Sequence, residues 1–388
     1  MSFLFEYIDI NPKETIIRGC LAKKIPMDKL QPFCRDIPEY ETSEFNGGSK
    51  FRNGDTIMAR ITPCLENGKT AMVNILDSNE VGFGSTEYIV FRAKKNLTTP
   101  DFVYYLICSS LVRDPAIKSM VGSSGRQRVQ TDVIANLDID FPKLSDQVKI
   151  AGVLKSLDDK IALNNEINNN LEQQAEALFH SLFIENANPT WKDGVLSDLG
   201  TVVAGGTPSK TKPEYYSEQG IAWITPKDLS LNKSKFISRG EIDISELGFS
   251  KSSATKMPTG TVLFSSRAPI GYIAIAANEV TTNQGFKSVV PNENVGTAFI
   301  YYLLKFLLPT IEGMASGSTF KEISGTGMKS VPVVIPDNEA IEKFNAFCTP
   351  IFQQQEVLEA ENSRLANIRD ALLPKLMSGE LDVSDIDI

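Results

Sequence analysis

The sequence is poor in the residues and motifs from which enzymes build active sites. Its 388 residues include one histidine, His180, so a Ser-His-Asp or Cys-His catalytic site is not expected. It contains neither a P-loop nor a G-x-G-x-x-G motif behind a predicted strand. It also lacks a spaced acidic cluster with the E-x-K pattern that a nuclease would need. We therefore predict no catalytic residues in this chain.

Disulfide, metal and membrane signals are missing too. The five cysteines are scattered and odd in number, without a C-x-x-C pair, which argues for a reducing cytoplasm and against a disulfide scaffold or a zinc site. The longest apolar run, 299–311, is broken by Lys305 and Pro309 and is shorter than the ~20 residues of a membrane span. The first residues lack the basic region and cleavage site of a signal peptide. We therefore expect a cytoplasmic protein with no membrane segment and no metal.

Positive charge is in short supply, because 39 Lys and Arg residues against 48 Asp and Glu residues leave a net charge of −9. Such a balance argues against nucleic-acid binding. Part of the acidic excess lies in residues 379–388, which we interpret as an acidic tail. Net charge does not say where the cations lie, and several of them gather in loops. The acidic balance also suits a protein that works only when covered by more basic partners.

Two segments of the chain, residues 120–142 and 314–336, repeat each other. Each begins with Met before a glycine-serine loop and ends, 22 residues later, with a short β-like run and Pro. The offset of 194 residues is half the chain length, and it also relates 178–183 to 372–377. A repeat this long duplicates a whole domain together with a helix, unlike the short periods of solenoids. The sequence therefore predicts two similar heads and two similar rods.

The two copies can be followed further back, with offsets that drift between 197 and 206. Equivalent passages include the Gly-initiated runs that end at Pro63 and Pro269, and the Tyr-Tyr pairs at 104–105 and 301–302. Element cores are kept while the loops change length, so we expect heads with a common frame that recognise different things. A hydrophobic content of 42% is enough for two globular domains with separate cores.

Each predicted rod carries apolar residues at alternating steps of four and three, the 3.5-residue spacing of a coiled-coil seam. We place the rods at 144–184 and 337–378 and expect them to pack antiparallel within the chain. Asn168 and Asn362 occupy equivalent positions, and buried asparagines fix register and partner choice at a cost in stability. The predicted contact positions are Leu154, Leu157, Ile161, Asn168 and Leu171 in the first rod, and Ile351, Leu358, Asn362 and Leu365 in the second.

Caps and prolines bear on where the rods begin and end. The plausible N-caps are Ser145-Asp146 and Asp337-Asn338. Because proline lacks the N–H that a helix interior needs, Pro350 is expected to kink or restart the second rod. For the same reason Pro374 is expected to end or bend it.

The heads, at 1–143 and 185–336, mix short β-like runs with an amphipathic helix, which gives an α+β fold with two globular domains separated by two long antiparallel helices. The two Tyr-Tyr pairs are expected in the cores and not as stacking platforms for bases. Strand candidates are Thr56–Arg60, Tyr88–Arg92, Thr261–Ser265, Tyr272–Ala276 and Val331–Ile335. Helix candidates are Phe102–Ser109 and Phe299–Leu308.

Polar loops at equivalent points of the two heads supply the candidate binding residues. Glycine and hydroxyl residues let a backbone approach phosphates, arginine can neutralise a phosphate or fork onto guanine, and Asn or Gln suits adenine. Each loop alone is more often a solvated turn, but their recurrence in two repeats favours function. The candidates are Arg60, Ser123, Ser124, Arg126, Gln127, Arg128, Gly206, Thr207, Ser209, Lys210, Lys212, Tyr216, Lys227, Arg267, Asn283, Gln284, Lys287, Ser318 and Lys321.

Four further passages are distinctive when they are combined with the half-length repeat. They are the Leu-Ser-Asp-Leu-Gly run at 196–200 with Gly-Gly-Thr-Pro-Ser at 205–209, the Trp-containing run 221–229, Gly-Phe-Lys at 285–287, and the ending 372–381. Over its whole length the chain closely resembles the specificity subunit of type I restriction-modification systems. The opening of the first head, 5–12, departs from this pattern because it lacks the Gly-Gly-Thr-Pro-Ser loop.

The resemblance implies a non-catalytic subunit with two target-recognition domains, each of which reads one half of a split, asymmetric site in double-stranded DNA. Two helices would hold the half-sites a fixed distance apart and dock two adenine-N6 methyltransferase subunits. The methyltransferases would bring S-adenosylmethionine, and restriction and translocation subunits would bring ATP with Mg²⁺. No cofactor is expected in this chain itself.

Two other classes of function stay open at this point. One is an enzyme such as a stand-alone methyltransferase, whose catalytic loop the run Asn-Pro-Thr-Trp at 188–191 loosely resembles. That run lacks a second proline and has no cofactor-binding glycine loop near it, so we interpret it as a linker. The other class is a two-headed, non-catalytic protein-binding scaffold that does not contact DNA, which the acidic composition favours.

Overall fold

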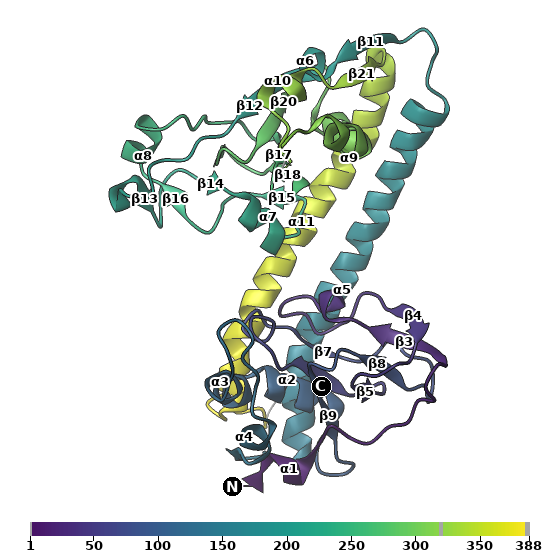
Figure 1. The fold of residues 1–388 in the computed structure, drawn as a ribbon, viewed down its shortest axis with the longest axis vertical. Coiled ribbons are helices and arrows are strands. Elements are labelled where there is room, and N and C mark those ends of the chain that lie inside the picture. The colour runs from purple at the N-terminus through teal and green to yellow at the C-terminus, as the bar shows by residue number, and fades with distance from the viewer. Residues whose placement is uncertain (1, 318–320, 385–388) are drawn as a thin grey trace. The chain divides into compact units, whose positions relative to one another are not determined.

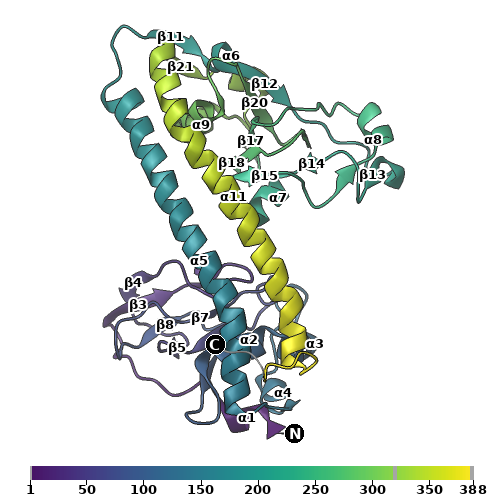
Figure 2. The same cartoon turned by 180° about the vertical axis from the view of Figure 1, so that it is seen from behind.

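The structure is a computed structural model that describes residues 2–317 and 321–384 (Figure 1). The chain divides into two compact units, each with its own head. Unit 1 is Met1–Leu163 with Asn362–Ile388, and unit 2 is Asn164–Glu361. Both units contain part of each long helix, α5 (Leu144–His180) and α11 (Asn338–Met377). Within each unit the two helix segments run side by side in opposite directions (Figures 1 and 2).

The head of unit 1 contains two four-stranded sheets, in the orders β2-β9-β6-β7 and β4-β3-β8-β5, and a two-stranded pair, β1-β10. One core lies between the sheets around Phe51 and Ile57, and a second surrounds α2 and the two long helices. The elements are β1 (Ser2–Phe3), α1 (Leu4–Tyr7), β2 (Ile8–Ile10), β3 (Leu21–Ile25), η1 (Met27–Lys29), β4 (Glu41–Glu44), β5 (Lys50–Phe51), β6 (Thr56–Ala59), β7 (Thr70–Met72), β8 (Gly82–Gly84), β9 (Tyr88–Ala93), α2 (Pro100–Cys108), α3 (Ser110–Lys118), α4 (Thr131–Ala135) and β10 (Asp138–Ile139).

The head of unit 2 is built around one five-stranded sheet in the order β12-β20-β17-β18-β15, with two-stranded pairs β11-β21, β13-β16 and β14-β19. The elements are η2 (Ser181–Glu185), β11 (Lys192–Val195), α6 (Leu196–Leu199), β12 (Gly200–Ala204), η3 (Pro213–Tyr215), β13 (Tyr216–Ser217), β14 (Trp223–Ile224), α7 (Pro226–Leu231), β15 (Phe236–Ile237), β16 (Asp243–Ile244), α8 (Glu246–Ser250), β17 (Val262–Ser266), β18 (Ile270–Ala276), β19 (Thr281–Thr282), β20 (Lys287–Pro291), α9 (Thr297–Met314), α10 (Gly325–Lys329) and β21 (Pro332–Ile335).

The two heads share the central arrangement that the repeat predicts. In unit 1, β6 pairs with β9 and α2 packs on their sheet; in unit 2, β17 pairs with β20 and α9 packs on theirs. The pair Thr56–Phe91 in the first ladder corresponds to Val262–Val289 in the second. The predicted α+β class, the strand and helix candidates and the repeated frame are therefore confirmed. The domain boundaries at 143/144, 184/185 and 336/337 stay a prediction.

Helix α2 forms because its sequence satisfies both capping and burial, whereas α9 follows Gly296 without a side-chain cap and forms by burying its apolar face. The Thr99 hydroxyl accepts a hydrogen bond from the Phe102 N–H, and Pro100 occupies the first turn, where its missing N–H costs nothing. The buried faces include both Tyr-Tyr pairs, whose four rings are at most 8% exposed. The prediction that these tyrosines belong to the cores is confirmed.

The long helices correct two sequence predictions. Helix α5 begins at Leu144, so Ser145 and Asp146 lie in its first turn and do not cap it. Helix α11 continues through Pro350 and Pro374 to Met377, so neither proline ends or restarts it. The 40-residue helix forfeits one backbone donor at each proline, while packing of its apolar face stabilises the remaining turns. The cap at Asp337 is confirmed, because its carboxylate accepts from the Ala340 N–H at 2.9 Å.

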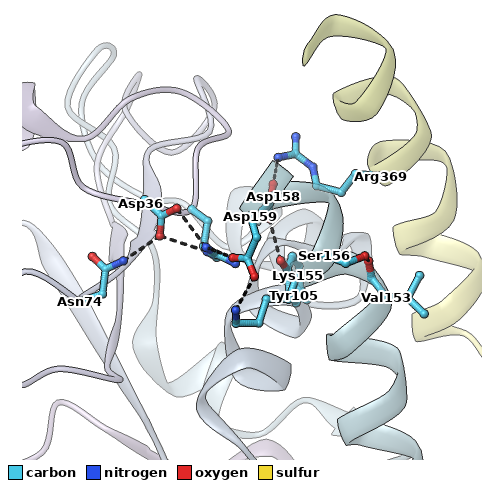
Figure 3. Close-up of polar contacts among 10 residues, drawn as sticks. Asp36, Asn74, Tyr105, Val153, Lys155, Ser156, Asp158, Asp159 and Arg369 are labelled. Atoms are coloured by element: carbon cyan, nitrogen blue, oxygen red, sulfur yellow. Dashed lines mark hydrogen bonds and ion pairs between the residues drawn. The ribbon is translucent and has the colours of Figure 1, made fainter. Parts of the chain in front are cut away.

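A buried ion pair fastens the two long helices to the head of unit 1. The Arg369 guanidinium of α11 donates to Asp158 of α5 at 2.6 Å, and the Tyr105 hydroxyl of α2 donates to the other carboxylate oxygen at 2.7 Å (Figure 3). The side chains of Arg369 and Asp158 are 10% and 5% exposed. Beside them, Arg35 donates to Asp159 of α5 at 2.6 Å. Side chains from both helices and the head therefore hydrogen-bond one another, with Asp158 and Arg369 buried.

A second polar cluster does the same in unit 2, with different residues. Lys235, just before β15, donates to Glu172 of α5, and to Gln355 of α11 at 2.7 Å. The Tyr302 hydroxyl of α9 and the Lys305 ammonium also donate to Glu172, at 2.8 and 2.7 Å. Tyr302 occupies the position in the repeat that Tyr105 occupies in unit 1. In both heads a repeated tyrosine thus donates to a carboxylate on α5.

No helix in the described ranges has the length and apolar character needed to span a membrane.

Candidate nucleic-acid interface

Three loops that are distant in sequence meet at one edge of the head of unit 1. They are the turn after β6, the turn before β9, and the glycine-serine loop at 121–129. Backbone hydrogen bonds join them: Arg60 N–H donates to the Glu87 carbonyl at 2.9 Å, Val129 N–H to the Arg60 carbonyl at 2.8 Å, and Thr62 N–H to the Gln127 carbonyl at 3.0 Å. Because main-chain bonds fix this junction, the side chains of all three loops are held at one edge.

The head of unit 2 has the same junction at equivalent positions. Ser266 N–H donates to the Gly285 carbonyl at 2.7 Å, and Ile323 N–H donates to the Ser266 carbonyl at 3.1 Å. These bonds correspond to the Arg60–Glu87 and Val129–Arg60 bonds of unit 1, with offsets of 206, 198 and 194 residues for the three loops. The bridge Ile61–Arg128 likewise corresponds to Arg267–Glu322. The repeat therefore duplicates a loop junction and not only a fold.

An ion pair crosses the junction in unit 1. Arg128 presents two guanidinium nitrogens to the carboxylate of Glu87, with contacts of 2.7 and 3.0 Å, and Arg60 lies 3.9 Å from the same carboxylate. The hydrogen bonds from Arg128 hold the pKa of Glu87 below its ordinary value. The guanidinium of Arg126 makes no ion pair with any residue that the structure describes. Of the three arginines predicted in this head, Arg60 and Arg128 therefore pair with Glu87, whereas Arg126 is exposed to solvent.

An ion pair also crosses the junction in unit 2. Arg267 and Lys287 each lie 3.4 Å from the carboxylate of Glu322. The Lys287 side chain is only 10% exposed and also donates to the Ser266 hydroxyl at 3.4 Å. Sequence reasoning proposed Lys287 as a surface contact, and the structure places it mainly inside the head. Neither Glu87 nor Glu322 was predicted from the sequence, because a single glutamate in a loop belongs to no motif or spacing that would indicate its role.

A cavity of about 710 Å³ opens beside this junction in unit 2. It brings together candidate residues that lie far apart in the sequence, and it adds Trp223, Asp228 and Glu241, which were not among the candidate binding residues. The Asp228 carboxylate is occupied by the capping of α7, since it accepts from Thr225 and from the Glu241 N–H. The sequence candidates that line the cavity are Thr207, Lys210, Tyr216, Lys227, Arg267, Asn283 and Gln284.

The Gly-Gly-Thr-Pro-Ser loop forms one wall of this cavity because glycine permits a very close approach. A Cβ atom on Gly205 would lie 1.9 Å from the Asn283 carbonyl oxygen, and one on Gly206 would lie 2.3 Å from the Ala254 nitrogen. The Trp223 indole N–H donates to the Gly206 carbonyl at 2.9 Å. The Tyr216 hydroxyl donates to the Pro208 carbonyl at 2.8 Å. Hydrogen bonds from Trp223 and Tyr216 thus hold the backbone of the Gly-Gly-Thr-Pro-Ser loop in place.

Replacement of Gly205 by alanine is expected to destabilise unit 2 by about 1–3 kcal/mol, the usual cost of overpacking a filled site. The added methyl group can be accommodated only if β12 moves away from the turn that carries Asn283. Urea unfolding followed by tryptophan fluorescence measures this, since Trp191 and Trp223, both in unit 2, are the chain's two tryptophans. Gly313→Ala is the matched control, because nothing lies within 4 Å of its Cβ position. Equal stability of the two variants would contradict the expectation.

The remaining candidates lie outside these clusters or make local contacts. Ser123 and Ser124 are exposed in the glycine-serine loop of unit 1, and Lys321 is exposed in that of unit 2. The Ser209 hydroxyl hydrogen-bonds to Thr211 at 2.9 Å, and the Lys212 ammonium lies 5.5 Å from the centre of the Tyr215 ring. Lys227 pairs with Glu241 at 2.6 Å. Ser318 lies outside the described residues. Contact of any of these residues with DNA stays a prediction.

The helix positions predicted to meet a partner helix lie along the packed faces of α5 and α11. Leu154, Ile351 and Leu358 are buried, and the other six are half-buried or at the margin of the seam. The acidic members of the ionic clusters, Asp158 and Glu172, were not predicted from the sequence. In the sequence these two acids look like ordinary exposed residues of a helix. Their role becomes clear only in the structure, where lysine, arginine and tyrosine side chains from other elements face them. Among the described residues, no three His, Cys, Asp or Glu side chains gather as a possible metal site.

Comparison with known proteins places these features in one family. The family model described as "Type I restriction modification DNA specificity domain" matches residues 32–173 and 188–364. The MjaIX specificity subunit of Methanocaldococcus jannaschii, a type I restriction enzyme subunit, is 41% identical over 155 residues, which cover 39% of this chain and 36% of that protein. The HindI specificity subunit of Haemophilus influenzae is 25% identical over 407 aligned positions, covering 85% of this chain and 87% of that protein.

A solved structure shares the fold. The crystal structure of a type I restriction-modification system S subunit from M. genitalium covers 97% of this chain, and 95% of that chain is covered in turn. Its TM-score is 0.59 at 16% sequence identity. At this identity the likeness establishes the common architecture, while the two separate family matches, one per repeat, account for the duplicated heads.

Proposed function

Because the chain belongs to the family of type I restriction-modification DNA specificity domains, we propose that it recognises double-stranded DNA as the non-catalytic specificity subunit of a restriction-modification complex. The observation that carries this proposal is the duplicated loop junction. Each head gathers cations, hydroxyls and amides from three loops on one edge of a sheet. Cations can contact phosphates, and amides and arginines can contact base edges, so one edge offers both kinds of contact.

The finer part of the proposal concerns what each head reads. The junctions have the same backbone but different side chains: Arg126 and Gln127 in unit 1, and the cavity with Asn283, Gln284 and Lys210 in unit 2. Different donors and acceptors select different base edges. We therefore propose that the two heads read two different half-sites, and that the complete target is bipartite and asymmetric.

The complex is proposed to contain two methyltransferase subunits, docked on the long helices, and restriction and translocation subunits. S-adenosylmethionine would then enter with the methyltransferases, and ATP with Mg²⁺ would enter with the restriction subunits. The acidic composition supports this arrangement, since a protein with a net charge of −9 gains affinity for DNA when basic partners surround it.

The alternative is a two-headed protein-binding scaffold that does not contact DNA. Its argument is the net negative charge, but the clustering of cations at matching edges of both heads favours DNA. A binding titration of the chain, with and without methyltransferase subunits, at several salt concentrations separates the two. A DNA reader loses affinity steeply with salt because it releases counterions, while a protein scaffold shows no DNA affinity to lose.

Exchange of residues 1–143 for the first head of another family member is expected to change one half of the methylated motif and leave the other half intact. Sequencing of methylated sites in cells that express the hybrid measures this directly. Exchange of residues 185–336 is the matched control and is expected to change the opposite half only. A hybrid in which both halves or neither half changed would contradict the assignment of one half-site to each head.

A further inference from the structure

The ion pairs at the two junctions connect the same loops with their charges exchanged. Arg128 of unit 1 and Glu322 of unit 2 are equivalent, being 194 residues apart in the repeated glycine-serine loop. Glu87 is equivalent to Gly285, and Lys287 lies two residues beyond it, at the first position of β20. In unit 1 the loop therefore supplies the cation and the turn supplies the acid. In unit 2 the loop supplies the acid, and the cations come from the start of β20, at Lys287, and from Arg267 after β17.

This exchange of sign bears on what position 128 does. Phosphates are negative on every DNA sequence, so a phosphate contact shared by the two heads would need a cation at both 128 and 322. The second position holds a glutamate. A guanine contact by Arg128 would need its fork of donors, and those donors already face Glu87 in a two-pronged contact at 2.7–3.0 Å. Neither kind of DNA contact fits both heads.

We propose that Arg128–Glu87 in unit 1 and Glu322 with Lys287 in unit 2 are positioning residues, which latch the glycine-serine loop to the neighbouring turn. This proposal rests on the proposed function, and it gives different residues of each loop different roles. The latch sets the shape of the loop, and the neighbouring exposed cations, Arg126 in unit 1 and Lys321 in unit 2, contact the DNA. Neither of these two cations forms an ion pair with any residue that the structure describes.

Partial burial and main-chain support make such a latch effective. The carboxylates of Glu87 and Glu322 are 24% and 35% exposed, and each faces two cations from separate loops. Main-chain bonds flank each ion pair, as with Val121 and Arg128, which exchange bonds of 2.9 and 3.0 Å. The glycines give the loop no rigidity of their own, so its shape depends on these contacts.

The decisive experiment reverses the charges in unit 1 so that they copy unit 2. The full chain, assembled with methyltransferase subunits, is made as Glu87→Lys, as Arg128→Glu, and as the double variant. Affinity for target and for non-target DNA is measured at several salt concentrations. Each single reversal is expected to lower the target-to-non-target ratio by roughly fivefold or more, since it replaces a well-formed, partly exposed ion pair by repulsion. The double variant is expected to recover the wild-type ratio and salt dependence.

Arg126→Gln is the comparison variant, because it removes a cation that we assign to DNA. It is expected to reduce the slope of log affinity against log salt by about 0.9, the effect of one lost phosphate contact on duplex DNA. No change at position 87 should restore it. A double reversal as defective as Arg128→Glu alone would show that Arg128 contacts DNA, and would overturn the latch. A wild-type complex with no preference for any DNA sequence would instead overturn the proposed function.

Discussion

Replacement of Arg369 by methionine is expected to destabilise unit 1 by about 3–5 kcal/mol, the typical cost of leaving one member of a buried ion pair without its partner. Asp158 is 5% exposed, and after the change the Tyr105 hydroxyl, at 2.7 Å, is its one remaining donor among the residues that the structure describes. Burial by itself would lower the pKa of Arg369, but the attraction of Asp158 raises it, so the guanidinium is held in its charged form. Arg369→Met therefore removes the charged partner of Asp158 and leaves this carboxylate buried among apolar side chains.

The double variant Asp158→Asn with Arg369→Met is the matched control. It removes both charges and retains an acceptor for the Tyr105 hydroxyl, so we expect it to recover most of the lost stability. Urea unfolding is followed by circular dichroism and by tryptophan fluorescence. Because both tryptophans belong to unit 2, the fluorescence transition should stay in place while the dichroism shows an earlier transition. A single variant as stable as the wild type would contradict the role given to this pair.

Much of the frame could be predicted from sequence because it obeys periodic rules. The 3.5-residue spacing on 144–184 and 337–378 indicated two long helices, and the structure has them at Leu144–His180 and Asn338–Met377. β-Branched and aromatic residues predicted the strands β6, β9, β17 and β18. The prolines of α11 neither restart nor end the helix, because their local cost is offset by packing along a helix of 40 residues, while a kink or bend at them stays a prediction.

The site could be predicted only in part, for a different physical reason. Glycine, hydroxyl and arginine residues mark loops that approach a ligand, and those loops do meet at the junctions in both heads. The sequence could not show which cation is free and which is paired, since that depends on a carboxylate from another loop. Glu87 lies 41 residues from Arg128, and Glu322 lies 35 residues from Lys287. The same long-range pairing hid Glu172 and Lys235, which are 63 residues apart.

Glu172→Gln is expected to destabilise unit 2 at neutral pH by about 3 kcal/mol, because it removes the carboxylate to which the Lys235 ammonium, 7% exposed, donates. Burial alone would raise the pKa of Glu172, but attraction and hydrogen bonding by Lys235 and Lys305 outweigh it and lower the pKa to about 2. For Lys235 the balance is reversed, since burial lowers its pKa more than Glu172 raises it. The pKa shifts of Glu172 and Lys235 differ because the charged carboxylate is stabilised by two cations, Lys235 and Lys305.

The pH dependence of this variant follows from the lowered pKa of Glu172. Above pH 4.5, the ordinary pKa of glutamate, the carboxylate is charged in both the folded and the unfolded chain, and its full stabilisation is present. Between pH 4.5 and about 2 the unfolded chain takes up a proton that the folded chain does not, so the stabilisation falls with pH. The difference in unfolding free energy between the wild type and Glu172→Gln should therefore shrink across this window. Because it is a difference, the contributions of carboxylates far from Glu172 largely cancel.

Glu176→Gln is the matched control for this measurement. Its carboxylate is 43% exposed and lies 3.4 Å from Lys305, so its removal is expected to cost less than about 1 kcal/mol, with little dependence on pH. Tryptophan fluorescence during urea unfolding, repeated from pH 7 to pH 3, gives the free energies for all three proteins. A Glu172→Gln deficit that stayed constant over this range would mean that the carboxylate contributes through packing and not through its charge. A deficit that shrank only in Glu172→Gln would assign the stabilisation to the charge that joins Lys235, Lys305 and Tyr302 to α5.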